Sequence, residues 1–437
     1  MNLGVPVLRM VSAFARIKVD CSSEQSPTTR TRSVNGLETF KSSCDVDDEG
    51  SKHNTSHSTL HHLTQLSIAS KMDQNIIRRR GVGTQGLDEK TALKGYTLIA
   101  PLTSKNVYLI DNNGKVAHQW DLPHRVGRHA RLLPNGNLAV GMKDPNAPAP
   151  FLFFNKYGGG IYQELDPQGN VVNEHRDPLG HHDCYFAGDG HFYYAGLQAL
   201  TKEQAAALPG GVPGTEAPDG KVYSDTIREV KDGKLVWEWK VAEKLDPKVF
   251  PLQHHYPREH WPLINAIYPM ADGNILASMR SVSAVVIIEK STGDIIWHLD
   301  STVVAQQHCA NELPNGNILI FDNGAFRHRE SFQWSRAIEV DRATKKIVWQ
   351  WHAPSKEAFY TPFMGSAQRL PNGNTLLCES AFGRVVEINT DGDMCWEYVC
   401  PYFSQYPEKE ARDFFPSNSN ALFRAYKYAP EEIPWLQ

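Results

Sequence analysis

From about residue 95 onward, apolar and polar residues alternate in short runs that are separated by turn sequences. Alternation with a period of two is typical of a β-strand with one buried face, and a polar turn between two such runs predicts a hairpin. Six predicted hairpins end in a strand that usually carries tryptophan. They are Ile110–Trp120, Leu165–His175, Glu229–Trp239, Ile288–Trp297, Glu339–Trp351 and Glu387–Tyr398.

A second kind of hairpin, built on a Pro-Asn-Gly-Asn or similar turn, interleaves with the first. Its members are Leu132–Val140, a degenerate copy at Phe186–Phe192, Met270–Ser278, Glu312–Phe321 and Arg369–Leu377. Two hairpins per unit make a four-stranded antiparallel sheet, which is the blade of a β-propeller. Because the first kind occurs six times and the second five times, one blade is predicted to use both chain ends. We expect the strand Tyr96–Ala100 to pair with the outer strands near Glu387–Tyr398 and close the ring.

The predicted fold is therefore all-β, a six-bladed β-propeller over residues 91–437, with a loop at Thr201–Gly220 lying over one face. Residues 1–90 are rich in Ser, Thr, His and charge and poor in aromatic residues, which predicts a disordered tail. The first acidic residue, Asp20, follows Arg9, Arg16 and Lys18, so the tail carries a candidate targeting segment. We expect a cytoplasmic protein, with an organelle reached through an N-terminal transit segment as the alternative.

Composition narrows the classes of partner. The 45 Lys and Arg residues against 49 Asp and Glu give a net charge of −4, so nucleic acid is not an expected partner. No apolar run is long enough to span a bilayer, so no membrane partner is expected either. The seven cysteines form no CxxC pair, and free thiols are expected. A disulfide between Cys395 and Cys400 is the alternative.

Candidate chemistry lies about five or six residues before each inner turn. The innermost strands of a propeller run along its axis, so equivalent positions on different blades converge on one space. These positions hold Arg128-His129, His181-His182-Asp183, Asn265, Gln307-His308 and Gly365-Ser366. Arg280 follows on the hairpin of Asn265, while the loops add His254, His255, His260 and Trp261. Blade packing does not require histidine in one register on three blades, which favours a functional cluster.

Four stretches resemble the arylsulfotransferase-like propeller family. They are HHDC (181–184), QHCANELPNGNILIFDNG (307–324), SAQRLPNGNTLLCESAFGRVVEI (366–388) and NALFRAYKYAP (420–430). The resemblance covers about residues 95–430. Family members with an assigned reaction move a sulfuryl group from a phenolic sulfate ester to another phenol, through a sulfated histidine and without a nucleotide donor. The resemblance therefore implies a transferase that needs no cofactor and acts on small aromatic or phenolic substrates.

Carried over by motif, the resemblance implies catalytic roles for five residues. His308 is the nucleophile, His181 and His182 assist at the bridging oxygen, and Asn265 and Arg280 hold the sulfuryl oxygens. Arg128, His129, His260 and Trp261 are expected to contact substrate. The family's assigned sulfotransferases place a histidine two residues before the asparagine, where this chain has Leu263. His260, in the neighbouring turn, is the candidate replacement for a general acid.

These residue types suit sulfuryl transfer. Neutral imidazole, with an ordinary pKa of about 6.5, is a competent nucleophile near pH 7. Negative charge develops on the leaving phenolic oxygen, and each well-placed donor there typically contributes about 3 kcal/mol.

The sequence is also compatible with two other functions for the predicted propeller. His129, His182 and His308 could bind one divalent metal ion in a hydrolase, lyase or oxygenase. The propeller could also be a non-catalytic scaffold that displays loops to a partner. The sequence identifies neither donor nor acceptor, and it leaves the oligomeric state unknown.

Overall fold

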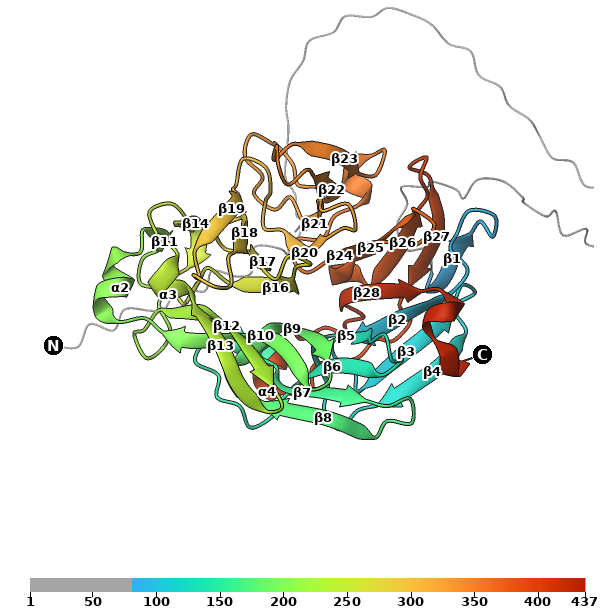
Figure 1. Ribbon diagram of the computed structural model, residues 1–437, viewed down its shortest axis with the longest axis horizontal. Coiled ribbons are helices and arrows are strands. Elements are labelled where there is room, and N and C mark those ends of the chain that lie inside the picture. Colours follow the sequence, from blue (N-terminus) through green and yellow to red (C-terminus); the bar gives the residue numbers. More distant parts are fainter. Residues whose placement is uncertain (1–80, 437) are drawn as a thin grey trace, which may run out of the picture. The chain divides into compact units, whose positions relative to one another are not determined.

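The structure is a computed structural model that describes residues 81–436, and it has six antiparallel sheets arranged as the blades of a β-propeller (Figure 1). The predicted fold class is confirmed. Most of the predicted tail, residues 1–80, lies outside the described residues. The predicted boundary at residue 91 is wrong, because strand β1 already occupies Gly83–Leu87 and pairs with β27.

Blades 1 to 3 follow one another along the chain. Blade 1 contains β5 (Val126–Leu132), β6 (Leu138–Lys143), β7 (Gly160–Leu165) and β8 (Val171–Arg176). Blade 2 contains β9 (Gly180–Gly188), β10 (His191–Ala199), β12 (Tyr223–Lys231) and β13 (Lys234–Lys240). Blade 3 contains β16 (Ile264–Pro269), β17 (Ile275–Met279), β18 (Ala284–Ile288) and β19 (Ile295–Leu299).

Blades 4 to 6 complete the ring. Blade 4 contains β20 (His308–Glu312), β21 (Ile318–Asp322), β22 (Arg336–Val340) and β23 (Ile347–Trp351). Blade 5 contains β24 (Ser366–Arg369), β25 (Thr375–Glu379), β26 (Arg384–Ile388) and β27 (Met394–Val399), with β1 at its outer edge. Blade 6 contains β28 (Leu422–Tyr428), β2 (Tyr96–Pro101), β3 (Asn106–Asp111) and β4 (Val116–Asp121).

Shorter elements decorate this ring. The predicted loop after β10 contains helix α2 (Lys202–Ala207) and β11 (Gly210–Val212), which pairs with β14 (Leu252–Pro257). The short strand β15 (His260–Trp261) pairs with β12. The remaining elements are α1 (Phe154–Tyr157), α3 (Val241–Lys244), η1 (Lys356–Ala358), η2 (Ser380–Phe382), α4 (Lys409–Phe414), η3 (Pro430–Glu432) and η4 (Pro434–Leu436).

Both chain ends contribute to blade 6, as the hairpin count predicts, but the predicted pairing is wrong. Strand β2 lies between β28 and β3, and it does not pair with the outer strands of blade 5. The partner of those outer strands is β1, which pairs with β27. This closure joins the first and last parts of the described chain in one sheet (Figure 1).

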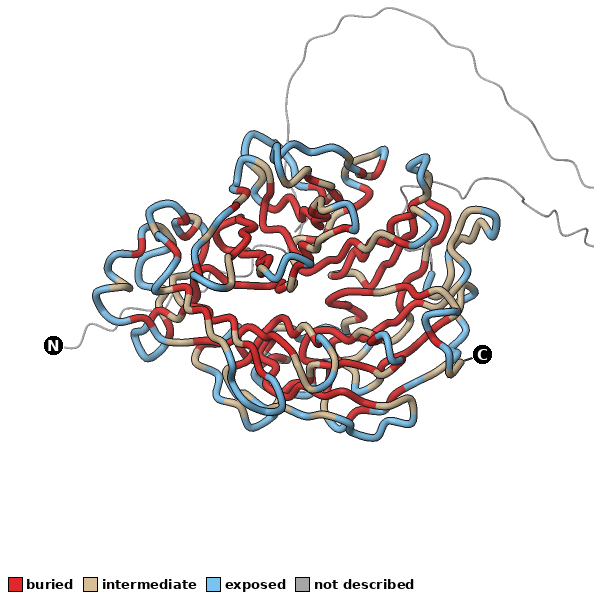
Figure 2. Tube along the Cα trace, viewed as in Figure 1, coloured by how far each residue is buried: buried red, intermediate tan, exposed pale blue. Residues whose placement is uncertain are grey.

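Local turn chemistry explains the inner hairpins. In four of them an Asn-Gly or Asp-Gly turn places glycine at φ between +82° and +87°, where a side chain would be strained: Gly136, Gly273, Gly316 and Gly373. Side chains of the second and third strands of each blade are largely buried, whereas most residues of the outermost strands are exposed or only partly buried. Figure 2 shows this gradient from the buried interior of the ring to its exposed periphery.

The repeated tryptophans connect neighbouring blades. In five blades the indole Nε1–H at the end of the outer strand donates to a backbone carbonyl in the outer turn of the next blade. These bonds are Trp120 to Asp166, Trp239 to Gly293, Trp297 to Arg342, Trp351 to Gly392 and Trp396 to Asn112. A large apolar side chain with one polar atom suits this place, because it fills the seam and still satisfies its donor.

Two smaller predictions concern cysteines and membranes. The five cysteines of the described chain (Cys184, Cys309, Cys378, Cys395 and Cys400) are buried free thiols, so the alternative disulfide is absent. Cys21 and Cys44 lie outside the described residues. Between residues 81 and 436, no helix has the length and apolar character needed to cross a bilayer.

Candidate active site

β-Bulges in the inner strands aim side chains at the axis of the ring. The strand pairing slips in five of the six inner strands, and the pairing of β24 stays regular. In β5, β9 and β16 the slip falls on residues that the sequence singles out. The bulged residues are Gly127, Arg128 and His129; His182 and Asp183; Asn265; Cys309 and Ala310; and Phe423 and Arg424. A bulge reorients a side chain relative to a regular strand, and bulges are enriched next to active sites.

Strained backbone gathers in the same region. Among the non-glycine residues with positive φ are His182 (47°), Leu263 (65°), Gln306 (52°), Cys309 (51°) and Met364 (63°). Such conformations cost of order 1–3 kcal/mol each and persist where the surrounding structure enforces them. Three of these five residues, His182, Leu263 and Met364, line one cavity, which indicates that the surrounding structure holds its geometry.

A cavity of about 200 Å³ collects the predicted residues Arg128, His182, His260, Arg280 and His308. These come from blades 1 to 4 and from β15, so the predicted convergence of separate blades is found. The remaining lining residues are Phe153, Lys156, Tyr157, Tyr256, Pro257, Glu259, Leu263, Phe363, Met364, Phe415 and Phe423.

His308 is held in one tautomer. Its Nδ1 lies 2.7 Å from Asn323 Oδ1 and 3.2 Å from the Gln306 carbonyl oxygen, both of which are acceptors, so Nδ1 carries the proton. The Asn323 amide is oriented by its Nδ2, which donates to the carbonyls of Thr361 and Met364. The unprotonated Nε2 faces the cavity and accepts the Met364 backbone N–H at 3.1 Å. Burial, followed by the charge of Arg280, holds the pKa of His308 well below its ordinary range.

Positive charge dominates the polar part of the cavity. Within the described chain, no carboxylate lies at ion-pair distance from Arg128, Lys156 or Arg280. Burial lowers the pKa of Arg128 to about 9 and that of Lys156 to about 7. The one acidic residue in the lining is Glu259, whose pKa burial raises to about 7. An anionic ligand would therefore supply the missing counter-charge.

Aromatic rings complete the wall. The Arg128 guanidinium lies 5.6 Å from the Tyr157 ring centroid and 5.5 Å from that of Phe423. The Lys156 ammonium lies 4.4 Å from the Phe363 ring centroid and 3.8 Å from that of Phe415. The cavity thus combines cations for an anion with flat apolar surfaces for a ring.

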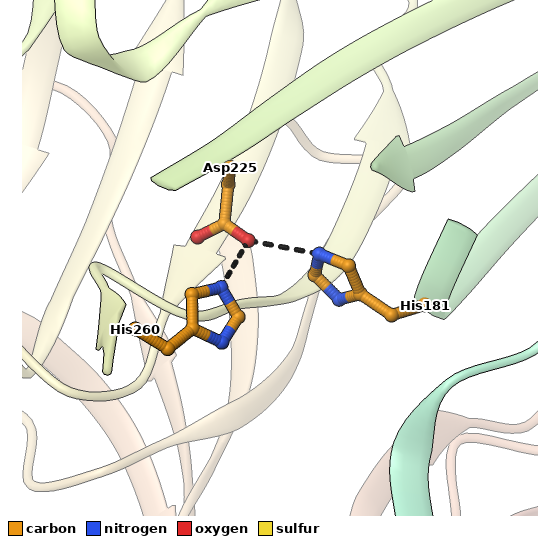
Figure 3. A group of neighbouring side chains, drawn as sticks. All are labelled: His181, Asp225 and His260. Atoms are coloured by element: carbon orange, nitrogen blue, oxygen red, sulfur yellow. Dashed lines mark hydrogen bonds and ion pairs between the residues drawn. The ribbon is translucent and has the colours of Figure 1, made fainter. Parts of the chain in front are cut away.

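A buried carboxylate, Asp225 on β12, connects two histidine branches (Figure 3). His260 Nε2 donates to Asp225 Oδ1 at 2.7 Å, and its Nδ1 lies 2.9 Å from the Tyr157 hydroxyl. His181 Nε2 lies 2.9 Å from the same carboxylate oxygen, and its Nδ1 lies 2.9 Å from Nδ1 of His182. Burial alone would raise the pKa of Asp225, but His260 and His181 outweigh it and hold that pKa at about 2. The carboxylate is therefore charged at neutral pH.

The structure does not bring together the metal-ligand set considered from sequence. His182 and His308 line the cavity described above, whereas His129 lies 3.4 Å from Asp183 and lines another cavity. Among the described residues, the group compatible with a metal ion is His181, Asp225 and His260, whose ligand atoms lie within 4.8 Å of one another. The 2.7 Å separation of His260 and Asp225 is that of a charge-assisted hydrogen bond. Two ligands that are each about 2.0 Å from one metal ion usually lie farther apart than this.

Two predicted site residues, Asn265 and His129, do not line this cavity but belong to the buried polar network next to it. Asn265 is fully buried, and its Nδ2 donates to the Gln307 carbonyl at 2.8 Å. His129 belongs to a layer centred on the Arg424–Asp183 ion pair, in which both N–O distances are 2.9 Å. Arg424 also donates to the Asn265 carbonyl at 2.9 Å. This layer lines a second cavity of about 180 Å³, which shares no lining residue with the first.

The predicted substrate contact of Trp261 is wrong. Its side chain belongs to a hydrophobic core cluster, and its indole donates to the Phe250 carbonyl at 2.9 Å. Of the other loop candidates, His254 and His255 do not line the cavity that contains His308. His260 alone among them reaches it, because β15 pairs with β12 and places the imidazole beside Asp225.

Sequence reasoning missed several lining residues. Tyr157 and Lys156 lie on α1, an insertion between β6 and β7 without a repeat signature. Tyr256 and Glu259 come from the chain around β14 and β15, and Met364 directly precedes β24. Arg424 and Phe423 lie on the inner strand of blade 6, where no Asn-Gly turn marks the register. Their position could have been found from the NALFRAYKYAP stretch once the closing blade was recognised.

Comparisons with known proteins complete this picture. A protein of unknown function from Bacteroides caccae is 14% identical, with a TM-score of 0.44 over 76% of this chain and 98% of its own. Virginiamycin B lyase from Staphylococcus aureus is 11% identical, with a TM-score of 0.40 over 74% and 89%. TM-scores this low support no inference about the chain. No curated protein matches it.

One comparison is decisive for the family. The family model described as arylsulfotransferase (ASST) matches residues 158–400, which is more than half of the chain. The matched segment includes His182, Arg280 and His308. The chain belongs to the arylsulfotransferase family.

Proposed function

We propose that the protein transfers a sulfuryl group from a phenolic sulfate ester to a second phenol, with His308 as nucleophile and without a nucleotide donor. The observation that carries the proposal is the placement of His308 Nε2 in a cavity with aromatic walls and with cations that have no carboxylate partner between residues 81 and 436. A sulfate ester of a phenol matches both properties, since it joins an anion to a ring.

The reaction has two displacement steps. In the first, the Nε2 lone pair forms a bond to sulfur, the bond from sulfur to the aryl oxygen breaks, and the phenol leaves with that electron pair. In the second, the oxygen of the acceptor attacks sulfur, the nitrogen–sulfur bond breaks, and its electrons return to Nε2. Nε2 must exchange its hydrogen bond with the Met364 N–H for the sulfur atom.

Neighbouring groups support these steps. The Nδ1–H of a sulfated His308 keeps its two acceptors, Asn323 Oδ1 and the Gln306 carbonyl, which stabilise the positive ring. Arg280 and Arg128 are proposed to hold the sulfuryl oxygens, because both guanidinium groups line the cavity without a carboxylate partner within the described chain. Asn265, which the resemblance assigns to the same task, is proposed to act through the backbone of Gln307, since its amide bonds there.

The proposed reaction requires no metal ion. The Asp225 group is compatible with a ligand set, but its distances favour hydrogen bonding. Metal analysis of the purified protein tests this point. Near-stoichiometric bound metal would favour a metal-dependent reaction and would count against sulfuryl transfer through His308. We also propose a small aromatic partner and no nucleic acid or membrane partner, because the candidate site is a small cavity with aromatic walls.

Phenol release from a chromogenic aryl sulfate, with a second phenol as acceptor, tests the proposal. Wild-type protein should release phenol, and His308→Ala should lose the activity. His298→Ala is the matched control, because that histidine lies on the outer strand β19 and packs on Phe250 outside the cavity. Absence of wild-type turnover across a broad panel of aryl sulfates would overturn the proposed function.

A further inference from the structure

The catalytic cavity contains one hydroxyl backed by a histidine and a carboxylate. Tyr157 lies on α1, His260 on β15 and Asp225 on β12, and all three side chains are buried. We propose that the Tyr157 hydroxyl is the general acid and base of sulfuryl transfer, an inference that rests on the proposed function. His260 and Asp225 are positioning residues: His260 exchanges a proton with Tyr157, and Asp225 stabilises the protonated imidazole. We refer to Tyr157, His260 and Asp225 as the proton relay.

The hydrogen bonds define the direction of the proton relay. Asp225 is a charged acceptor, so His260 Nε2, at 2.7 Å, must carry a proton. The second carboxylate oxygen of Asp225 accepts the Ile264 backbone N–H at 2.9 Å, which fixes the orientation of the carboxylate. When His260 is neutral, its Nδ1 has a lone pair and accepts the Tyr157 hydroxyl at 2.9 Å. The lone pairs of the hydroxyl oxygen then remain available to a ligand.

The relay shares its cavity with the nucleophile. Tyr157, His260 and His308 all contribute to the same lining. The Tyr157 ring lies 4.3 Å from the His182 ring, and Phe423 lies 6.3 Å from the rings of both His182 and His308, as centroid distances. A sulfate ester held by Arg128 and Arg280 would therefore have His308 and the Tyr157 hydroxyl within the same enclosed space.

The relay also accounts for a departure from the family pattern. Leu263 occupies the position where the assigned sulfotransferases have a histidine, and its side chain lines the same cavity. His260 is three residues earlier, on β15; it lines the same cavity and bonds to the Tyr157 hydroxyl. The acid–base function that Leu263 cannot perform is thus assigned to a hydroxyl from another blade.

Protons balance over the two displacement steps. Before the first step His260 is protonated on both nitrogens, its Nδ1–H donates to the Tyr157 oxygen, and the Tyr157 proton faces the ester. As the sulfur–oxygen bond breaks, the leaving oxygen takes the Tyr157 proton and Tyr157 takes the Nδ1 proton. In the second step the acceptor phenol gives its proton to the Tyr157 oxygen, and the Tyr157 proton returns to Nδ1. Asp225 stabilises the imidazolium, and the relay ends as it began.

The second histidine branch on Asp225, formed by His181 and His182, is less suited to proton transfer. His182 connects to the carboxylate through a second imidazole, that of His181, and it lies beside the Arg128 charge, which opposes its protonation. His260 contacts the carboxylate directly.

Leaving groups of different basicity separate acid catalysis from simple positioning. A nitrophenolate leaves without a proton, whereas a methylphenolate needs one. Phenol release in the first turnover should fall roughly 100-fold for 4-methylphenyl sulfate in Tyr157→Phe. With 4-nitrophenyl sulfate the loss should be several times smaller. His260→Gln should show the same selective loss.

Tyr256→Phe is the matched control. It removes a hydroxyl from the same cavity, but that hydroxyl donates to Gln306 Oε1 at 2.8 Å and takes no part in the relay. Both sulfates should be affected by the same factor in this variant. Equal losses for the two sulfates in Tyr157→Phe and His260→Gln would overturn the relay while leaving the proposed function intact. No release from either sulfate by wild-type protein would instead overturn the proposed function.

Discussion

At the scale of single residues, His308 illustrates how a buried imidazole is kept reactive. Two acceptors hold a proton on Nδ1, and burial together with the Arg280 charge disfavours a second proton on Nε2. The neutral form, which is the form that the proposed nucleophile requires, therefore persists to lower pH than that of an exposed histidine. An exposed histidine would become protonated in the range of its ordinary pKa, about 6.5.

This arrangement predicts a histidine that stays neutral in mild acid. Because the pKa of His308 is lowered, its ring should remain unprotonated as pH falls through the ordinary imidazole range, about 6.5. The check is the chemical shift of labelled histidine Cε1, assigned through the resonance that is missing from His308→Gln. A titration midpoint near the ordinary value would contradict this prediction.

Lys156 should make anion binding pH-dependent. Burial and the neighbouring arginines lower its pKa to about 7, so free Lys156 loses its charge as pH rises through that value. Benzenesulfonate, a non-transferable analogue of the donor, should bind more weakly above about pH 7, and calorimetric titration across pH measures this. Lys156→Arg should flatten the dependence and Lys156→Met should weaken binding throughout. A wild-type Kd that does not change with pH would count against this role.

The sequence predicted the histidine and arginine side chains of the first cavity better than the residues around them. His182, Arg280 and His308 were found because inner-strand positions converge in a propeller and because the motifs resemble a known family. Tyr157 and Asp225 carry no local signal, since an isolated tyrosine on an insertion and an aspartate within a strand have no diagnostic spacing. Trp261 was misassigned because nothing in a loop sequence distinguishes a buried ring from one that faces a cavity.

At the scale of strands and hairpins, the two most regular features of the sequence have separate physical roles. Asn-Gly turns set the inner hairpins, and the tryptophans at the ends of the outer strands close the seams between blades. The turns depend on residues that are close in sequence, and the tryptophan contacts repeat from blade to blade. Both features could therefore be predicted from the sequence pattern. The bulges depend on how each inner strand meets its neighbour, which the pattern does not encode.

The seam between blades 4 and 5 allows a direct test of the tryptophan contacts. Trp351→Phe removes the hydrogen bond to the Gly392 carbonyl and part of the buried ring, and it should lower the free energy of unfolding by about 2 kcal/mol. Trp349→Phe on the same strand is the control. Its ring is only partly buried and contacts Arg369, so a smaller loss is expected. Urea unfolding followed by circular dichroism measures both, and equal losses would argue against the seam contact.

At the scale of the whole molecule, the strand that closes the ring also supplies residues of the candidate site. Strand β28 pairs with β2. It also places Arg424 in an ion pair with Asp183 and Phe423 in the lining of the cavity that contains His308. The pattern predicted a closing blade because one inner hairpin was missing, but it could not name the partner of β2. Pairing between strands more than 300 residues apart leaves no local trace.

Truncation should separate β28 from the segment after it. A chain ending at Asn420 loses β28, exposes the edge of β2 and leaves Asp183 without its cation, so it should aggregate. A chain ending at Ala429 keeps the strand but loses the buried Ile433 side chain and the Trp435 bond to the Gly136 carbonyl, so it should fold with reduced stability. Soluble yield and size-exclusion chromatography distinguish the two. A well-folded chain without β28 would show that closure is not required.

The central claim is that His308 carries the sulfuryl group between donor and acceptor. The most direct measurement mixes concentrated protein with 4-nitrophenyl sulfate in the absence of any acceptor and follows both nitrophenol and protein mass. We expect a burst close to one nitrophenol per protein, with the mass of one SO₃ group added to the peptide that contains His308. Steady turnover with acceptor but no burst, or the added mass on any other residue, would contradict the account.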